Sequence, residues 1–161
     1  MTQTKSRCLI LACGNTLRSD DGVGPWLAAW AQEKYHDEAS VRVISRQQWT
    51  PDLAEEIVNC ETILFIDCCV ESAPGALLVI DVHPMPVTQR GIGSHHQCPQ
   101  ELLALAQGLY EALPHSAKVL TIGAGSTGLS EDFSPAVIAA LPDACALLAQ
   151  TVSQLISLVS H

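Results

Sequence analysis

The sequence predicts an α/β protein: a three-layer α/β/α sandwich around a mostly parallel five-stranded sheet, with one antiparallel strand. Three observations predict this class. Apolar runs of strand length alternate with longer segments of helical periodicity, five such runs occur within 161 residues, and 48% of the residues are hydrophobic, which is enough for one packed core. Because no repeat or Pro/Gly/Ser-rich linker divides the chain, we expect a single domain over residues 1–161.

The first half of the chain predicts strands and helices in alternation. Residues 7–12 are an apolar run that ends in a glycine-containing turn, and a helix is expected to follow over residues 24–35. Residues 41–44 alternate as a second strand, and a Thr-Pro pair predicts a helix over residues 50–58. The third strand is expected over residues 62–66, which are apolar enough for both faces of the strand to be buried.

A fourth strand is expected over residues 76–82, in the opposite direction to the others. Only residues 67–75 separate it from the third strand. A helical crossover between parallel strands needs about a dozen residues or more, so this connection is too short for one. We therefore expect the fourth strand to run antiparallel, near an edge of the sheet.

The last part of the chain predicts a helix over residues 98–113, a fifth strand over residues 118–122 and a terminal helix that begins at 134 and is interrupted at Pro142. Apolar residues of the terminal helix recur at spacings of three and four, which predicts one face docked on the sheet. These residues are Ala144, Leu147, Leu148, Val152, Leu155, Ile156 and Val159.

Composition excludes several classes of protein. Lys plus Arg number 8 and Asp plus Glu 17, a net charge of −9, and no segment gathers the basic residues that nucleic acid requires. No apolar run approaches the roughly 20 residues of a membrane span, and the apolar stretch near the amino terminus fits a strand better than a signal peptide. Seven cysteines without a CxxC pair indicate reduced thiols. We therefore expect a cytoplasmic protein with neither nucleic acid nor membrane as a partner.

The loop after the first strand, residues 14–24, carries two adjacent carboxylates, Asp20 and Asp21. In open α/β sheets, ligands gather beyond the carboxyl ends of the strands, where this loop is expected. Either aspartate could instead cap the helix that begins near Gly24. Two neighbouring carboxylates repel each other unless a cation lies nearby, so a metal-binding role is the alternative.

Two further candidates for such a site lie at other strand ends. Asp67 follows the third strand directly, although loop amides alone could satisfy it. His95 and His96 precede the helix at Pro99, although a surface pair of histidines is commonly only solvated. Two carboxylates and one imidazole would form a three-ligand site with open positions for water or a substrate group. The other histidines are assigned to the solvated class: His36, His83, His115 and His161.

Two competing motifs carry less weight. Residues 123–128 match the GxGxxG pattern, but no further strand follows to complete a dinucleotide-binding βαβ unit. Cys68 and Cys69 lie among Asp67 and Glu71, whose charges raise a thiol pKa, so we interpret both as buried small apolar residues rather than nucleophiles. For Cys98, two residues beyond the histidine pair, both interpretations stay open: a buried apolar residue or a nucleophile.

Four segments together resemble the nickel-iron hydrogenase maturation endopeptidases. Residues 14–24 resemble the opening motif of that family, and Asp67 followed by Pro74-Gly75 resembles its second motif. Residues 94–97 resemble the histidine loop of the family, and Leu129-Ser130 with residues 140–142 resemble its carboxyl-terminal region. The four segments come in the same order as in the family and span nearly the whole chain.

The resemblance implies a cytoplasmic hydrolase that removes the carboxyl-terminal extension of a hydrogenase large-subunit precursor after nickel insertion. The residues that contact metal in the family map onto Asp21, Asp67 and His96, with His96 chosen because it directly precedes Gln97. The family is thought to recognise nickel already bound in the substrate, so the precursor would supply this ion. A non-catalytic nickel-binding hydrogenase assembly factor is the alternative, because it would share every motif.

Overall fold

The computed structural model describes residues 4–86 and 98–160 of the chain. Their strands form one five-stranded sheet in the order β2-β1-β3-β5-β4. Four of the strands run parallel, and β4 at the edge is antiparallel to β5. The bounds of the strands are Ser6–Cys13 (β1), Val41–Arg46 (β2), Cys60–Cys69 (β3), Leu77–Asp81 (β4) and Ser116–Gly123 (β5).

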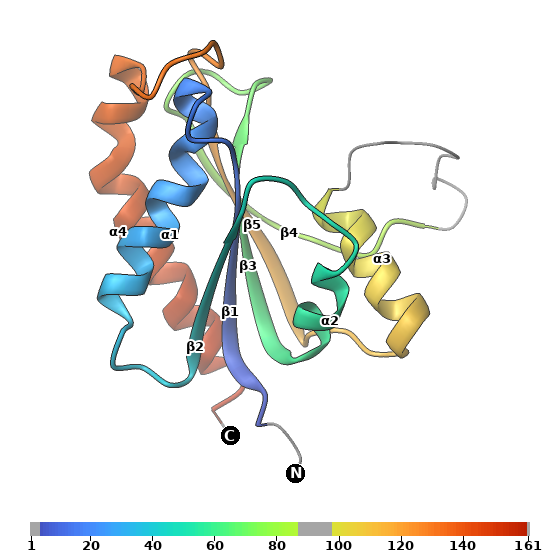
Figure 1. The fold of residues 1–161 in the computed structure, drawn as a ribbon. Coiled ribbons are helices and arrows are strands. Elements are labelled where there is room, and N and C mark those ends of the chain that lie inside the picture. The colour runs from blue at the N-terminus through green and yellow to red at the C-terminus, as the bar shows by residue number, and fades with distance from the viewer. Residues whose placement is uncertain (1–3, 87–97, 161) are drawn as a thin grey trace.

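Helices cover both faces of this sheet, so the predicted fold class is confirmed. Helices α1 (Val23–Lys34) and α4 (Pro135–Ser157) lie on one face, and α2 (Leu53–Val58) and α3 (Pro99–Tyr110) lie on the other (Figure 1). A short 3₁₀ helix, η1 (Ser19–Gly22), precedes α1. The carboxyl ends of the parallel strands all lie at one edge of the sheet, where the β1–α1 and β5–α4 connections also lie (Figure 1).

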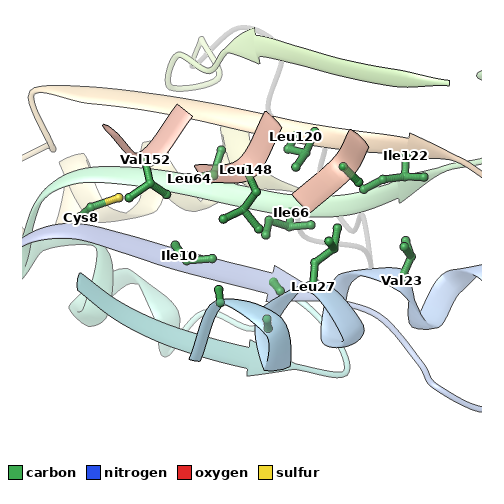
Figure 2. Packing of buried hydrophobic residues seen from close by; sticks show 14 of the residues in the cluster. Cys8, Ile10, Val23, Leu27, Leu64, Ile66, Leu120, Ile122, Leu148 and Val152 are labelled. Carbon is green, nitrogen blue, oxygen red and sulfur yellow. The ribbon is translucent and has the colours of Figure 1, made fainter. Parts of the chain in front are cut away.

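The central strand β3 anchors an apolar layer on each face of the sheet. Leu64 and Ile66 point toward α1 and α4, where they pack with residues of both helices such as Leu27 (Figure 2). Ile63 and Phe65 point the other way, into the layer beneath α2 and α3. Each such side chain, fully buried, contributes about 1.5 to 3 kcal/mol through the hydrophobic effect. The carboxyl end of β3 is therefore a rigid platform.

Four predicted boundaries are corrected. The helix expected over residues 50–58 begins only at Leu53, after a turn at residues 51–52. The terminal helix is not interrupted, because α4 continues through Pro142. Pro142 lacks only the amide that would bond the carbonyl of Ile138, and both residues are exposed, so water can satisfy that carbonyl. The helix expected to reach residue 113 ends at Tyr110, because Glu111 takes a left-handed conformation with φ 52°. Strand β3 runs two residues past Asp67 and therefore holds this carboxylate within the sheet.

Helix α4 is long and apolar enough to cross a membrane by length and composition alone. Core helices pass the same test, and a single such helix is weak evidence of a membrane span. Ala144, Leu148, Val152 and Leu155 of α4 are buried against the sheet. The predicted docking of its apolar face is therefore confirmed.

Candidate active site

Asp67 lies on β3 at the carboxyl edge of the sheet, on the face covered by α2 and α3. One carboxylate oxygen, Oδ1, accepts a hydrogen bond of 2.9 Å from the Cys68 amide. The other, Oδ2, accepts a long hydrogen bond of 3.4 Å from the indole Nε1–H of Trp49. Trp49 packs edge-on against Phe65, with ring centroids 5.7 Å apart and an interplanar angle of 82°. The strand and the indole ring therefore fix the position of Asp67.

Burial dominates the protonation equilibrium of Asp67. Desolvation raises the pKa of its carboxyl group to about 6, and the nearby negative charge of Asp21 adds to this increase. The hydrogen bonds from Cys68 and Trp49 act in the opposite direction but are outweighed. The ionised form of Asp67 is thus held in an environment that disfavours it.

Asp21 is presented by the loop between β1 and α1. Its Oδ2 accepts a hydrogen bond of 2.7 Å from the Asn15 amide, and Asn15 in turn accepts one of 2.9 Å from the Leu17 amide through Oδ1. Gly14 makes this turn possible, because a Cβ atom at that position would collide with the backbone carbonyl oxygen of Asp21. The glycine therefore lets the backbone of the loop fold onto itself and hold Asp21.

We expect Gly14→Ala to move the Asp21 loop without unfolding the sheet. The added methyl group cannot be accommodated by a side-chain rotation, since the atom that it meets belongs to the backbone. The variant should lose about 1 to 3 kcal/mol of stability, which chemical denaturation measures. An alanine variant with unchanged stability would contradict this account of the loop.

Asp20, the neighbour of Asp21, has a different environment. It is fully buried, with an exposed fraction of 0%. Its Oδ2 accepts hydrogen bonds from the amides of Gly125 (2.7 Å) and Ser126 (2.9 Å) and from the Ser134 hydroxyl (2.7 Å), and its Oδ1 accepts one from the Ser134 amide (2.7 Å). These four donors fasten η1 to the β5–α4 connection.

The hydrogen bonds decide the charge state of Asp20. Burial alone would raise the pKa of its carboxyl group, but the donors of Ser134, Ser126 and Gly125 together hold the pKa below its ordinary value. Asp20 is therefore an ionised structural residue whose oxygens are already occupied. Asp21, which is half-buried, is the candidate that remains available to a ligand.

The glycine-rich segment at residues 123–128 thus has a structural role: it binds a side chain of the protein itself. Its Gly125 and Ser126 amides bind the carboxylate of Asp20, in the way that such loops bind anionic ligands elsewhere. Ser19, beside Asp20, adopts a left-handed φ of 49° and donates a hydrogen bond of 2.7 Å from its hydroxyl to the Asp132 carbonyl. A left-handed serine is held only where its surroundings impose it, so the two loops form one rigid unit.

The site formed by Asp21 and Asp67 is electrostatically negative. The charge of Asp21 contributes to the raised pKa of Asp67. Desolvation, followed by the charges of Asp67 and Asp21, raises the pKa of Cys13 to about 12. Among the described groups that shift the pKa of Asp67, none is cationic. Two carboxylates that repel each other across a strand end suit a divalent cation, which would relieve the repulsion.

The predicted histidine ligand lies outside the described residues, as does its neighbour: His95 and His96 both fall within 87–97. Their assignment stays a prediction. Within residues 4–86 and 98–160, no three His, Cys, Asp or Glu side chains form a group that could hold a metal ion. The described part of the chain therefore contributes two of the three predicted ligands, and the third depends on the histidine loop.

The cysteines near the site differ from one another. All seven cysteines of the chain are free. Desolvation, followed by the charges of Asp21 and Asp67, raises the pKa of Cys68 to about 12, which suits the predicted inert thiol. The prediction for Cys69 is wrong: a hydrogen bond from the Ser72 hydroxyl and the neighbouring backbone amides lower its pKa, and it is only half-buried.

Sequence reasoning missed Trp49, the only indole that contacts the candidate carboxylates within the described residues. Its position directly before the Thr50-Pro51 pair marks the end of a loop, but nothing in the local pattern links it to Asp67. The contact depends on the alignment of β2 and β3 on either side of β1.

Comparisons with known proteins agree with this geometry at the level of the fold. No protein-family model matches the chain, and no curated protein matches it in sequence. Among solved structures, the hydrogenase maturating endopeptidase HybD from E. coli aligns with a TM-score of 0.74 and 16% identity, over 92% of this chain and 93% of that one. The chain has the fold of the hydrogenase maturation endopeptidases.

Two structures from Thermococcus kodakarensis are similar as well. The [NiFe] hydrogenase maturation protease HycI from Thermococcus kodakarensis KOD1 aligns with a TM-score of 0.67 and 18% identity, over 95% of this chain and 94% of that one. HybD from Thermococcus kodakarensis aligns with a TM-score of 0.66 and 24% identity, over 90% and 98%. The likeness covers nearly the full length of each chain.

Proposed function

We propose that this chain is a cytoplasmic endopeptidase that removes the carboxyl-terminal extension of a nickel-iron hydrogenase large-subunit precursor after nickel insertion. The observation that carries the proposal is the pair Asp21 and Asp67 at the carboxyl edge of the sheet. The pair is negatively charged, and one member has a raised pKa. The fold shared with the maturation endopeptidases and the order of the four sequence motifs support the same conclusion.

Nickel enters this proposal as part of the substrate. Asp21, Asp67 and His96 would complete the coordination of an ion that the precursor presents, and thereby test whether the precursor is loaded. Three ligands leave open positions for the groups of the precursor that already hold the ion. The reaction itself adds water across one peptide bond: the carbonyl carbon gains the hydroxyl group, and the departing nitrogen takes the proton.

A cleavage experiment tests the proposal against the assembly-factor alternative. The purified protein is incubated with nickel-loaded precursor, and mass spectrometry identifies the products. An endopeptidase releases one intact carboxyl-terminal peptide and turns over many precursor molecules. A non-catalytic nickel-binding assembly factor would bind the precursor and leave its mass unchanged.

We expect Cys69→Ser to retain most of the cleavage activity. Cys69 has a lowered pKa, which makes it the best candidate for a thiol nucleophile. However, Glu71 lies beside it, and none of the described histidines contacts it, so residues 4–86 and 98–160 provide no base with an orienting group for this thiol. Initial cleavage rates within about threefold of wild type would support the metal-dependent mechanism. Abolished cleavage in a folded Cys69→Ser protein would favour a thiol peptidase instead.

A further inference from the structure

A groove of about 560 Å³ lies on the α1 and α4 side of the carboxyl edge. Its apolar lining comes from three elements: Pro25 and Trp26 at the start of α1, Phe133 in the β5–α4 connection, and Ile138 on α4. Trp26 is 39% exposed and Ile138 is 56% exposed. Large apolar side chains gathered around a concavity are typical of a binding surface rather than of an ordinary protein exterior.

The groove borders the loop that carries Asp21. Thr16 and Gly22 of this loop line it. Beside it the loop pairs with the β5–α4 connection: the Ser130 amide donates to the Leu17 carbonyl at 3.0 Å, and the Ser19 amide donates to the Ser130 carbonyl at 2.7 Å. The same pairing presents two more apolar side chains to solvent, Leu17 (54% exposed) and Leu129 (86% exposed).

This surface is rigid as well as apolar. The four hydrogen bonds to Asp20 hold η1 and the β5–α4 connection together directly beneath it. Because the backbone that carries the exposed leucines is already fixed, a partner that covers them does not have to order the loops as well. Preorganisation of this kind favours a specific contact.

The charge of the groove indicates the chemistry of its partner. Two carboxylates, Glu131 and Asp132, belong to its lining, whereas none of the described residues that line it is cationic. The cationic residue Arg18 forms a backbone bridge with Ser130 in the neighbouring loops and is not among the lining residues. The whole chain carries a net charge of −9. An occupant that is apolar and bears a lysine or arginine complements this lining.

The groove and the candidate active site lie on opposite sides of the Asp21 loop. Asp67 shares the α2 and α3 face with Trp49 and Phe65, whereas the groove is bounded by α1 and α4. A chain segment at Asp67 would therefore leave the groove free. The groove suits a second part of the same substrate, away from the bond that is cleaved.

We propose that this groove docks an apolar segment, bearing a lysine or arginine, from the folded body of the precursor substrate. This inference rests on the proposed function, and it assigns a recognition surface separate from the carboxylate pair. A segment docked there would contact the loop that holds Asp21. It would align the precursor before the extension reaches Asp67.

Matched substitutions, one on α4 and one just past its carboxyl end, test the inference. Ile138→Glu places a charge in the groove, and Leu158→Glu places the same charge just past the other end of the helix, at a residue that is 59% exposed. Steady-state cleavage is measured with full-length nickel-loaded precursor. We expect Ile138→Glu to raise KM at least about tenfold with kcat within about twofold of wild type. Leu158→Glu should change neither constant.

Charge is tested separately. The KM of the wild-type protein should rise with salt concentration, and the double variant E131Q/D132N should show a higher KM with a weaker salt dependence. Sedimentation of the wild-type protein and of Ile138→Glu is run in parallel, because a second copy of this chain is the rival occupant.

The outcomes separate the two claims. Unchanged KM in Ile138→Glu, with normal cleavage by the wild type, overturns the docking site and leaves the proposed function intact. A wild-type dimer that Ile138→Glu converts to a monomer, with KM unchanged, assigns the groove to self-association and also overturns it. No cleavage by the wild-type protein overturns the proposed function, and the inference fails with it.

Discussion

Asp67→Asn should abolish precursor cleavage and at the same time stabilise the metal-free protein at neutral pH. The substitution keeps the shape of the side chain but removes the charge expected to contact nickel, so the cleavage rate should fall by more than about a hundredfold. It also removes a half-buried carboxylate whose ionised form is disfavoured by desolvation. Gain of stability with loss of activity is the signature of a residue kept for function.

The sign of the stability effect follows from the pKa. Burial raises the pKa of Asp67 from 3.8 to about 6, so between these values the folded state binds more protons than the unfolded state. Stability therefore falls as pH rises through that window, and the full penalty of the charged carboxylate applies above pH 6. A shift of this size corresponds to roughly 2 to 3 kcal/mol at pH 7.5.

Chemical denaturation of metal-free wild type and Asp67→Asn checks this result. The variant should be more stable by about 2 kcal/mol at pH 7.5, because part of the gain is offset by a weaker contact with Trp49, and the difference should vanish near pH 3.5. A variant less stable than the wild type at pH 7.5 would show that Asp67 is structural, and would remove the main physical argument for its role.

Asp20→Asn should have the opposite effect and destabilise the protein. An asparagine can offer one oxygen to the three donors around Oδ2, but its amide group would then face the Ser134 amide, donor against donor. Loss of the charge and one opposed buried donor should lower the free energy of unfolding by about 3 kcal/mol at neutral pH. Thermal and chemical denaturation measure this loss.

Asp21→Asn is the matched control for Asp20→Asn. Asp21 is half-buried, and within the described residues its side chain accepts one hydrogen bond, from the Asn15 amide. The variant should therefore lose less than about 1 kcal/mol of stability while losing cleavage. Equal destabilisation by the two substitutions would mean that the adjacent aspartates do not have separate roles.

The effect of Asp20 also has a defined pH dependence. Its pKa is lowered in the folded state, so the unfolded state binds more protons in acid, and the stabilisation by Asp20 is complete only above the ordinary value of 3.8. As pH falls through the folded-state pKa, this stabilisation disappears. The difference in free energy of unfolding between wild type and Asp20→Asn should therefore become smaller in acid. The corresponding difference for Asp67→Asn should appear only above pH 3.8.

Much of the fold could be predicted from the sequence because local rules determine it. The short connection of residues 67–75 excludes a helical crossover, and β4 is indeed antiparallel at the edge. The apolar run of β3 requires burial on both faces, and β3 lies in the middle of the sheet. Pro142 misled the prediction because a proline can be tolerated on the exposed face of a long helix.

The different roles of the aspartates at the site could not be predicted from local sequence rules. Asp20 and Asp21 are adjacent and chemically identical, and they differ only in what the fold brings to them. The donors around Asp20 come from Gly125, Ser126 and Ser134, more than a hundred residues away in the chain. Trp49 reaches Asp67 in the same non-local manner. The residue types in the sequence indicated where the site lies. Only the tertiary contacts show that Asp20 is structural and that Asp21 and Asp67 are the candidate ligands.

We propose above that Asp21, Asp67 and His96 recognise nickel carried by the precursor. The most direct test compares nickel-loaded and nickel-free precursor as substrates for the wild-type protein, with mass spectrometry of the released peptide. We expect release of one carboxyl-terminal peptide from the loaded precursor and no release from the nickel-free form. Equal cleavage of both forms would contradict it.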